Sequence, residues 1–206
     1  MHVFCDLDGV LSDFIQAACD LHRPGQSDEM VLARGRAIDP NAHPFKQLEL
    51  GLGVSTDAFW EGITAAGEAF WTDMAVLPFA KELWCRLNEA RPGHVSILTS
   101  PGAGVAAAAS SAGKYRWVLN HLGEDAPYRT IICPAPLKHH LAVGADGPNL
   151  LIDDYDVNIK RWVAAGGHAM QWPALQFHDR HATIADVDKA QRASGSGTNL
   201  VIGGAV

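Results

Sequence analysis

The stretch His2-Val-Phe-Cys-Asp-Leu-Asp-Gly-Val-Leu11 decides how this chain is expected to fold. Residues 3–5 are apolar and predict a short buried strand, and Asp6, Asp8 and Gly9 follow it directly. In open α/β sheets, ligands bind outside the carboxyl ends of the strands. Two carboxylates at such an end attract a divalent cation, which favours a site for phosphoryl chemistry. Taken alone, the same motif also fits a calcium-like or purely structural turn.

Size and charge restrict the classes of function. With 206 residues, of which 48% are hydrophobic and 19% charged, the chain predicts one globular core, alone or with a small inserted lid. A formal net charge of −7 argues against a partner that is a nucleic acid polymer. No run of about 18 apolar residues predicts a membrane span, and no targeting signal precedes the first strand, so we expect a cytoplasmic protein without a membrane partner. Cys5, Cys19, Cys85 and Cys133 are isolated and predict reduced thiols.

A regular alternation of helices and strands begins near Val76. Helices are expected over residues 76–90, 134–143 and 157–165, and a further one is expected to end at residue 122. Strands are expected over residues 94–98, 130–133, 149–152 and 168–172. Strands that alternate with helices predict an α/β fold with a doubly wound parallel sheet.

The rest of the chain interrupts this pattern. A helix is expected over residues 12–21, and residues 23–67 are expected to be irregular because several prolines and glycines break them. We therefore divide the chain into a core of residues 1–15 and 73–175, a cap insertion of 16–72, and a C-terminal extension of 176–206. The extension contains an expected helix near 184–193, and we interpret it as a packing or oligomer-contact segment.

Three further polar groups follow strands of the expected sheet. Thr99 and Ser100 can hold phosphate oxygens with hydroxyl and backbone N–H groups, although a helix cap is the commoner explanation of such a pair taken alone. Lys138 can bring one cation to the same edge. The adjacent acids Asp153 and Asp154 would repel each other without a compensating cation. Carboxylate oxygens favour magnesium over zinc.

His139 and His140 are the counter-proposal for a zinc site. They are adjacent rather than one helical turn apart, and no cysteine or acidic cluster surrounds them. We interpret them as ordinary helix residues.

The order Asp-x-Asp, Thr-Ser, Lys, Asp-Asp resembles the haloacid dehalogenase superfamily over roughly residues 2–172. This resemblance implies a Rossmann-like core with a small, mainly helical cap. It implies that Asp6 attacks phosphorus and Asp8 protonates the leaving oxygen, while Thr99, Ser100 and Lys138 bind the phosphoryl group. It further implies a Mg²⁺ cofactor held by Asp6, Asp8 and Asp154, with Asp153 supporting these ligands. The phosphatases of the family have an aspartate at the position of Asp8, and the dehalogenases lack it.

A closer resemblance is to the 5′(3′)-deoxyribonucleotidases. It is carried by Asp6-Leu-Asp-Gly-Val-Leu-Ser-Asp-Phe14, Leu98-Thr-Ser-Pro101, Lys114-Tyr-Arg-Trp-Val-Leu-Asn-His-Leu-Gly123 and Leu151-Ile-Asp-Asp154. It implies a nucleoside monophosphate as substrate and an aromatic pocket for the base, for which the candidates are Phe14, Phe45, Trp60 and Trp71. These rings serve equally well as the core of a small cap. Lys114 is either a phosphate ligand or, as we expect, a solvated helix residue.

Two features depart from the nucleotidase pattern. The cap is divergent, and Gly102-Ala-Gly104 stands where those enzymes often carry a lysine. The alternatives are therefore a phosphatase for another small monoester, such as a sugar phosphate, and a catalytically silent member that binds a nucleotide or a protein. A dinucleotide-binding protein is disfavoured, because the glycine fingerprint is incomplete. Members of the nucleotidase family are often dimers, and the apolar tail is a candidate contact for a homodimer.

Overall fold

The computed structural model describes residues 1–42, 44–102 and 106–172. Its centre is a five-stranded parallel sheet in the order β3-β2-β1-β6-β7. The strands are β1 (Val3–Cys5), β2 (Val95–Thr99), β3 (Thr130–Ile132), β6 (Leu150–Asp153) and β7 (His168–Gln171). A short antiparallel pair, β4 (Val143–Gly144) and β5 (Gly147–Pro148), precedes β6. The predicted α/β fold with a doubly wound parallel sheet is confirmed.

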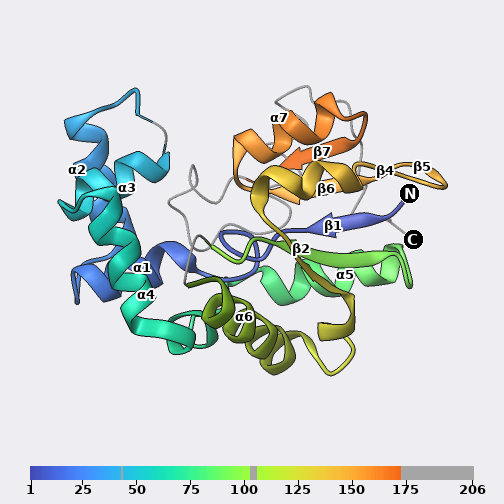
Figure 1. Cartoon of the computed structure of the whole chain (residues 1–206), viewed down its shortest axis with the longest axis horizontal. Helices are drawn as coiled ribbons and strands as arrows, with labels where there is room; N and C mark the ends of the chain where they lie inside the picture. The colour runs from blue at the N-terminus through green and yellow to red at the C-terminus, as the bar shows by residue number, and fades with distance from the viewer. Residues whose placement is uncertain (43, 103–105, 173–206) are drawn as a thin grey trace. The chain divides into compact units, whose positions relative to one another are not determined.

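Helices α5 (Ala80–Ala90) and α7 (Asp156–Ala164) flank this sheet on opposite sides (Figure 1), as right-handed crossovers require for strands added in opposite directions from β1. Two short 3₁₀ helices, η2 (Pro127–Arg129) and η3 (Ala135–Leu141), flank β3 in the sequence. The expected helix over 76–90 begins only at Ala80. The backbone N–H of Leu77 instead donates to the carbonyl of Leu11, 3.0 Å away, which ties this segment to the loop after β1.

Apolar residues of the central strands form the core. Phe4 of β1 lies edge-on to the ring of Trp162 on α7, with 5.6 Å between ring centroids, and both pack with Leu98 and Leu151. In the register of the sheet, Cys5 lies opposite Ile97 of β2 and Ile152 of β6. The first polar residues after these strands therefore leave the sheet at the same edge.

Contacts between residues divide the chain into two compact units. One comprises residues 1–12, 76–101 and 118–206, and the other comprises 13–75 and 102–117. The described part of the first unit holds the sheet. The second unit includes residues 102–117, a segment that our division from sequence assigned to the core.

The second unit is helical. Its helices are α1 (Phe14–His22), α2 (Asp28–Ile38), α3 (Pro44–Leu52), α4 (Thr56–Thr72) and the first part of α6 (Ala107–Leu122). The expectation that residues 23–67 are irregular is wrong. Gly25 and Pro40 do lie at helix ends, but Gly51 lies inside α3, and α4 continues through a kink at Gly67, which has a φ of 68°. Asp13 caps α1 by accepting from the N–H of Gln16, so this helix starts two residues later than expected.

No helix in the described ranges is both long and apolar enough to span a membrane. The C-terminal extension, including the helix expected near 184–193, lies outside the described residues.

Candidate active site

Asp6 is the first residue after β1 and is buried. Its backbone N–H donates to the carbonyl of Ile152, 2.8 Å away, which continues the pairing of β1 with β6. Its carboxylate has two partners among the described residues. Oδ1 accepts from the N–H of Leu7 at 2.8 Å, and Oδ2 lies 2.9 Å from Nζ of Lys138. The carboxylate is thus held in one orientation.

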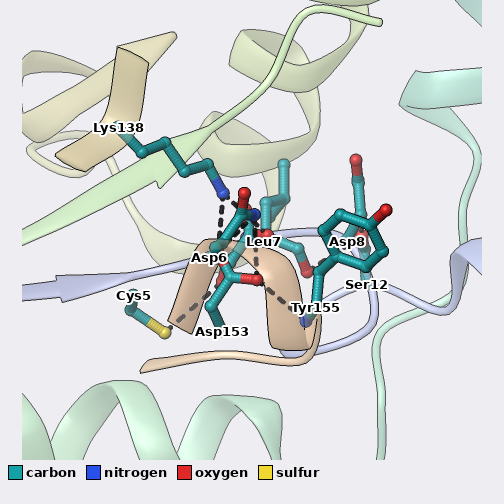
Figure 2. A network of polar contacts seen from close by, with 9 residues as sticks. Cys5, Asp6, Leu7, Asp8, Ser12, Lys138, Asp153 and Tyr155 are labelled. Atoms are coloured by element: carbon teal, nitrogen blue, oxygen red, sulfur yellow. Dashed lines mark hydrogen bonds and ion pairs between the residues drawn. The ribbon is translucent and has the colours of Figure 1, made fainter. Parts of the chain in front are cut away.

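Lys138 reaches the same place from η3. Only 2% of its surface is exposed, and Nζ lies between two carboxylates, 2.9 Å from Oδ2 of Asp6 and 2.8 Å from Oδ2 of Asp153 (Figure 2). Burial by itself lowers the pKa of an ammonium group, but the two negative charges outweigh it and raise the pKa of Lys138 above its usual value. The lysine therefore stays charged. Lys138 thus lies beside Asp6 and Asp153 at this edge of the sheet, and its role in binding a phosphoryl group stays a prediction.

Asp153 ends β6 and is fully buried. Besides Lys138, it accepts hydrogen bonds from the backbone N–H of Tyr155 at 2.9 Å and from the side-chain amide of Asn158 on α7. Burial and then the charge of Asp6 raise the pKa of Asp153 to about 7, and Lys138 opposes this rise. Sequence reasoning missed Asn158, because one asparagine in the first turn of a helix gives no distinctive signal.

Asp154 completes an acidic group. Oxygen atoms of Asp6, Asp153 and Asp154 all lie within 4.8 Å of one another. Burial and the charges of Asp153 and then Asp6 raise the pKa of Asp154 well above its usual value. If all three acids are ionised, they outnumber the single positive charge of Lys138, and a divalent cation would offset the excess negative charge. The donor set, all carboxylate oxygen, fits magnesium better than zinc.

The loop after β1 brings Asp8 to this region of the chain. The N–H groups of residues 10–12 converge on the carbonyl of Leu7, and Gly9 takes a φ of 74°, which favours glycine. The hydroxyl of Ser12 lies 3.3 Å from the carbonyl oxygen of Leu7 and 3.4 Å from Oδ1 of Asp8. The carboxylate of Asp8 is not among the three that lie within 4.8 Å of one another.

Thr99 and Ser100 stand at the carboxyl end of β2, the strand next to β1. Thr99 is fully buried, and its carbonyl accepts from the N–H of Cys133 at 3.0 Å. Both hydroxyl residues therefore leave the sheet at the edge where Asp6 lies. Their role in phosphate binding stays a prediction.

The four aromatic residues predicted for a base pocket all lie in the second unit. Phe14 and Trp71 are buried and nearly parallel, with ring centroids 5.8 Å apart. Phe45 and Trp60 are half-buried and also nearly parallel, with centroids 6.0 Å apart. The ring centroids of Phe14 and Phe45 lie 6.4 Å apart, so these two rings link the two pairs. All four rings thus contribute to the packing of this unit, and their role in binding a base stays a prediction.

The expectation that Lys114 is solvated is wrong. Only 1% of its surface is exposed, and Nζ lies 4.6 Å from the centroid of the Trp71 ring. The preceding Gly113 explains the burial. A Cβ at that position would lie 2.6 Å from the carbonyl oxygen of Glu68, so only glycine lets α6 approach α4 this closely.

His139 and His140 follow Lys138 in η3, with ring centroids 4.3 Å apart. Neither belongs to a group of three or more potential metal ligands in the part of the chain that the structure describes.

No protein-family model and no curated protein matches the sequence. Several solved structures are similar to the structure of this chain. The structure of a hydrolase from Streptococcus pneumoniae TIGR4 has a TM-score of 0.50 at 10% identity, over 92% of this chain and 97% of that one. This similarity shows that the chain shares the fold of that hydrolase.

Two further similar structures have lower scores. The phosphonoacetaldehyde hydrolase-like protein from Oleispira antarctica has a TM-score of 0.49 at 14% identity, over 96% of this chain and 86% of that one. The L-2-haloacid dehalogenase from Xanthobacter autotrophicus has 0.47 at 14% identity, over 94% and 82%. The 10% identity to the Streptococcus pneumoniae hydrolase establishes the fold alone, so the activity has to be argued from the residues of the site.

Proposed function

We propose that this protein is a magnesium-dependent phosphomonoesterase that works through an aspartyl-phosphate. The observation that carries the proposal is the buried carboxylate of Asp6, which is paired with Lys138 and lies in one group with Asp153 and Asp154. A carboxylate held in one orientation is a suitable nucleophile, and an ammonium group beside it can bind the phosphoryl oxygens.

The proposed reaction has two steps. In the first, a carboxylate oxygen of Asp6 bonds to phosphorus while the bond between phosphorus and the ester oxygen breaks, and Asp8 gives its proton to the leaving oxygen. In the second, Asp8 takes a proton from a water molecule whose oxygen bonds to phosphorus, which releases inorganic phosphate and restores Asp6. Splitting one displacement into two lowers each barrier.

The metal is proposed to be held by Asp6 and Asp154, with Asp8 as the third predicted ligand. The carboxylate of Asp154 accepts no hydrogen bond from any described residue, whereas both oxygens of Asp153 do accept hydrogen bonds. This difference supports Asp154 as the ligand and Asp153 as a supporting group. When bound, Mg²⁺ would supply positive charge against the negative charge of the phosphoryl group.

Dehalogenation of a haloacid is a weaker interpretation for this site. A cluster of three acids suited to a divalent cation fits a phosphoryl substrate, whose oxygens such a cation binds. Asp8 also supports the phosphatase, because it can act first as the acid and then as the base in ester cleavage. The dehalogenases of the superfamily that this sequence resembles lack an aspartate at that position.

For the substrate we propose a nucleoside monophosphate. The support is the resemblance to the deoxyribonucleotidases together with Phe45 and Trp60, aromatic residues of the second unit that keep part of their surface exposed. Stacking on an aromatic side chain contributes roughly 1–3 kcal/mol per base.

The test is phosphate release from a panel of 5′- and 3′-nucleoside and deoxynucleoside monophosphates and sugar phosphates, with and without Mg²⁺. Asp6→Asn serves as the blank. We expect Mg²⁺-dependent release from nucleotides that is lost in the variant. Release from sugar phosphates alone would retain the chemistry and reject the nucleotide. No release from any compound, with Mg²⁺ present, would reject the proposed phosphatase in favour of a silent binding protein.

A further inference from the structure

The side chain of Asn158 is aimed at the carboxylate of Asp153 from the first turn of α7. It is 5% exposed, and its Nδ2 lies 3.1 Å from Oδ1 and 3.0 Å from Oδ2 of Asp153. One amide thus contacts both oxygens of the same carboxylate. Asn158 was not among the residues that the sequence motifs single out.

Together with Asn158, the neighbouring groups saturate Asp153. Oδ1 also accepts from the N–H of Tyr155 at 2.9 Å, and Oδ2 from Nζ of Lys138 at 2.8 Å. Each oxygen therefore has two N–H donors. A metal ion could coordinate Asp153 only by displacing them, whereas the carboxylate of Asp154 accepts no hydrogen bond from any described residue.

The oxygen atom of the Asn158 amide indicates that this residue is present for its N–H donor. Oδ1 of Asn158 is buried and has no hydrogen-bond partner among the described residues. An unpaired buried acceptor has a cost of about 1–3 kcal/mol. A leucine of similar volume would avoid this cost, so packing alone does not explain an asparagine at this position.

We propose that Asn158 is a positioning residue that keeps Asp153 as the counter-ion of Lys138 and out of the coordination sphere of the metal. This inference rests on the proposed function. With Asp153 held by α7, Lys138 keeps its place 2.9 Å from the nucleophilic carboxylate of Asp6. The metal then faces Asp6 and Asp154.

The test combines calorimetric Mg²⁺ binding, without substrate, with steady-state kinetics and thermal melts in EDTA. In Asn158→Leu we expect Mg²⁺ to bind at least threefold more tightly, because Asp153 becomes available as an additional ligand. We also expect kcat to fall at least tenfold with KM within threefold of the wild type, because Lys138 loses its fixed partner. Asn158→Ser, which removes the amide but adds no bulk, should shift both quantities in the same directions and replaces the leucine variant if that one does not fold.

The matched control is Lys160→Ala on the same helix. Lys160 has a side chain that is 76% exposed and pairs only with Asp156 among the ion pairs of the described residues, so Mg²⁺ binding and kcat should stay at wild-type values. Mg²⁺ binding that is unchanged or weaker in both Asn158 variants overturns the proposal, since a merely structural role would weaken binding together with stability. If the wild type binds Mg²⁺ but hydrolyses no compound of the panel, the proposed function fails, and calorimetry alone still decides the role of Asn158.

Discussion

The carboxyl group of Asp154 fills the space that a side chain at position 9 would need. A Cβ built on Gly9 would lie 2.8 Å from Cγ of Asp154 and closer still to its Oδ2. The loop after β1 and the end of β6 therefore meet where only glycine fits, and this contact brings the acidic pair close to the loop that carries Asp8.

Replacing Gly9 by alanine should thus damage the site beyond its effect on the backbone. We expect Gly9→Ala to lower kcat at least tenfold and to weaken Mg²⁺ binding, because the Asp154 carboxylate must move. Gly93→Ala is the matched control. Gly93 has the same φ of 74°, but a Cβ there meets nothing within 4 Å, so this variant reproduces the backbone strain, about 1 kcal/mol, without the clash. Equal activity of the two variants would contradict the argument.

Lys138 should be essential to the stability of the fold as well as to activity. Lys138→Met leaves Asp6 and Asp153 buried without their shared cation, and breaking a buried ion pair in this way costs about 3–5 kcal/mol. Urea denaturation in EDTA at pH 8 measures the loss. The double variant Lys138→Met with Asp153→Asn should recover a large part of it, since one unpaired charge is removed. Additive losses would show that the two residues do not interact.

The polar residues of the site differ in how far the sequence predicts them. Asp6 and Asp153 follow apolar runs that have to become neighbouring strands, so the alternation of elements already places them at one edge of the sheet. Asn158 acts through an amide that the first turn of α7 directs back onto Asp153, and no local pattern encodes that direction. Lys114 is buried because of a helix contact at Gly113 that depends on tertiary packing. Periodicity therefore predicts strand ends well and helix-to-helix contacts poorly.

Magnesium should stabilise the protein more at high pH than at low pH. The pKa of Asp153 is raised to about 7, and that of Asp154 is raised as well. The metal-free folded state therefore binds protons more tightly than the unfolded state. These groups therefore favour folding below about pH 4, and that contribution is lost as pH rises through about 7. Mg²⁺ binds the ionised carboxylates, so it stabilises the folded state at the pH values where this contribution to stability is lost.

Thermal melts with and without Mg²⁺ at pH 5.5 and pH 8 test this expectation. Each tenfold excess of Mg²⁺ over its Kd adds about 1.4 kcal/mol, or about 3–6 °C in Tm for a chain of this size. We expect the increase at pH 8 to exceed that at pH 5.5 by at least this amount. Asp154→Asn should abolish most of the increase at both values. An increase of equal size at both pH values would contradict the linkage.

Within the second unit, two glycines let α2 and α3 pack backbone against backbone. A Cβ on Gly35 would collide with the carbonyl oxygen of Gln47 and lie 2.6 Å from its carbonyl carbon, and one on Gly51 would collide with the carbonyl of Val31. Gly35→Ala should therefore lower the free energy of unfolding by about 1–3 kcal/mol, although alanine favours a helix. Ala33→Gln adds a larger side chain to the exposed side of the same helix and should change it by less than about 0.5 kcal/mol.

The aromatic residues of the second unit provide the test of substrate choice. Phe14 and Trp71 are buried, so replacing either would destabilise the unit whatever it binds. Trp60 is half-buried, and its ring is nearly parallel to that of Phe45, so it is the better position for a binding test.

If the substrate is a nucleotide whose base stacks on this ring, Trp60→Ala should raise KM for nucleoside monophosphates about 5- to 150-fold, the equivalent of roughly 1–3 kcal/mol. Trp60→Phe should recover a large part of the loss. KM for ribose 5-phosphate, which has no base, serves as the internal control and should change less than twofold. A parallel rise for both compounds would mean that Trp60 supports the fold of its unit and does not contact a base, and sugar phosphates would then become the preferred substrates to pursue.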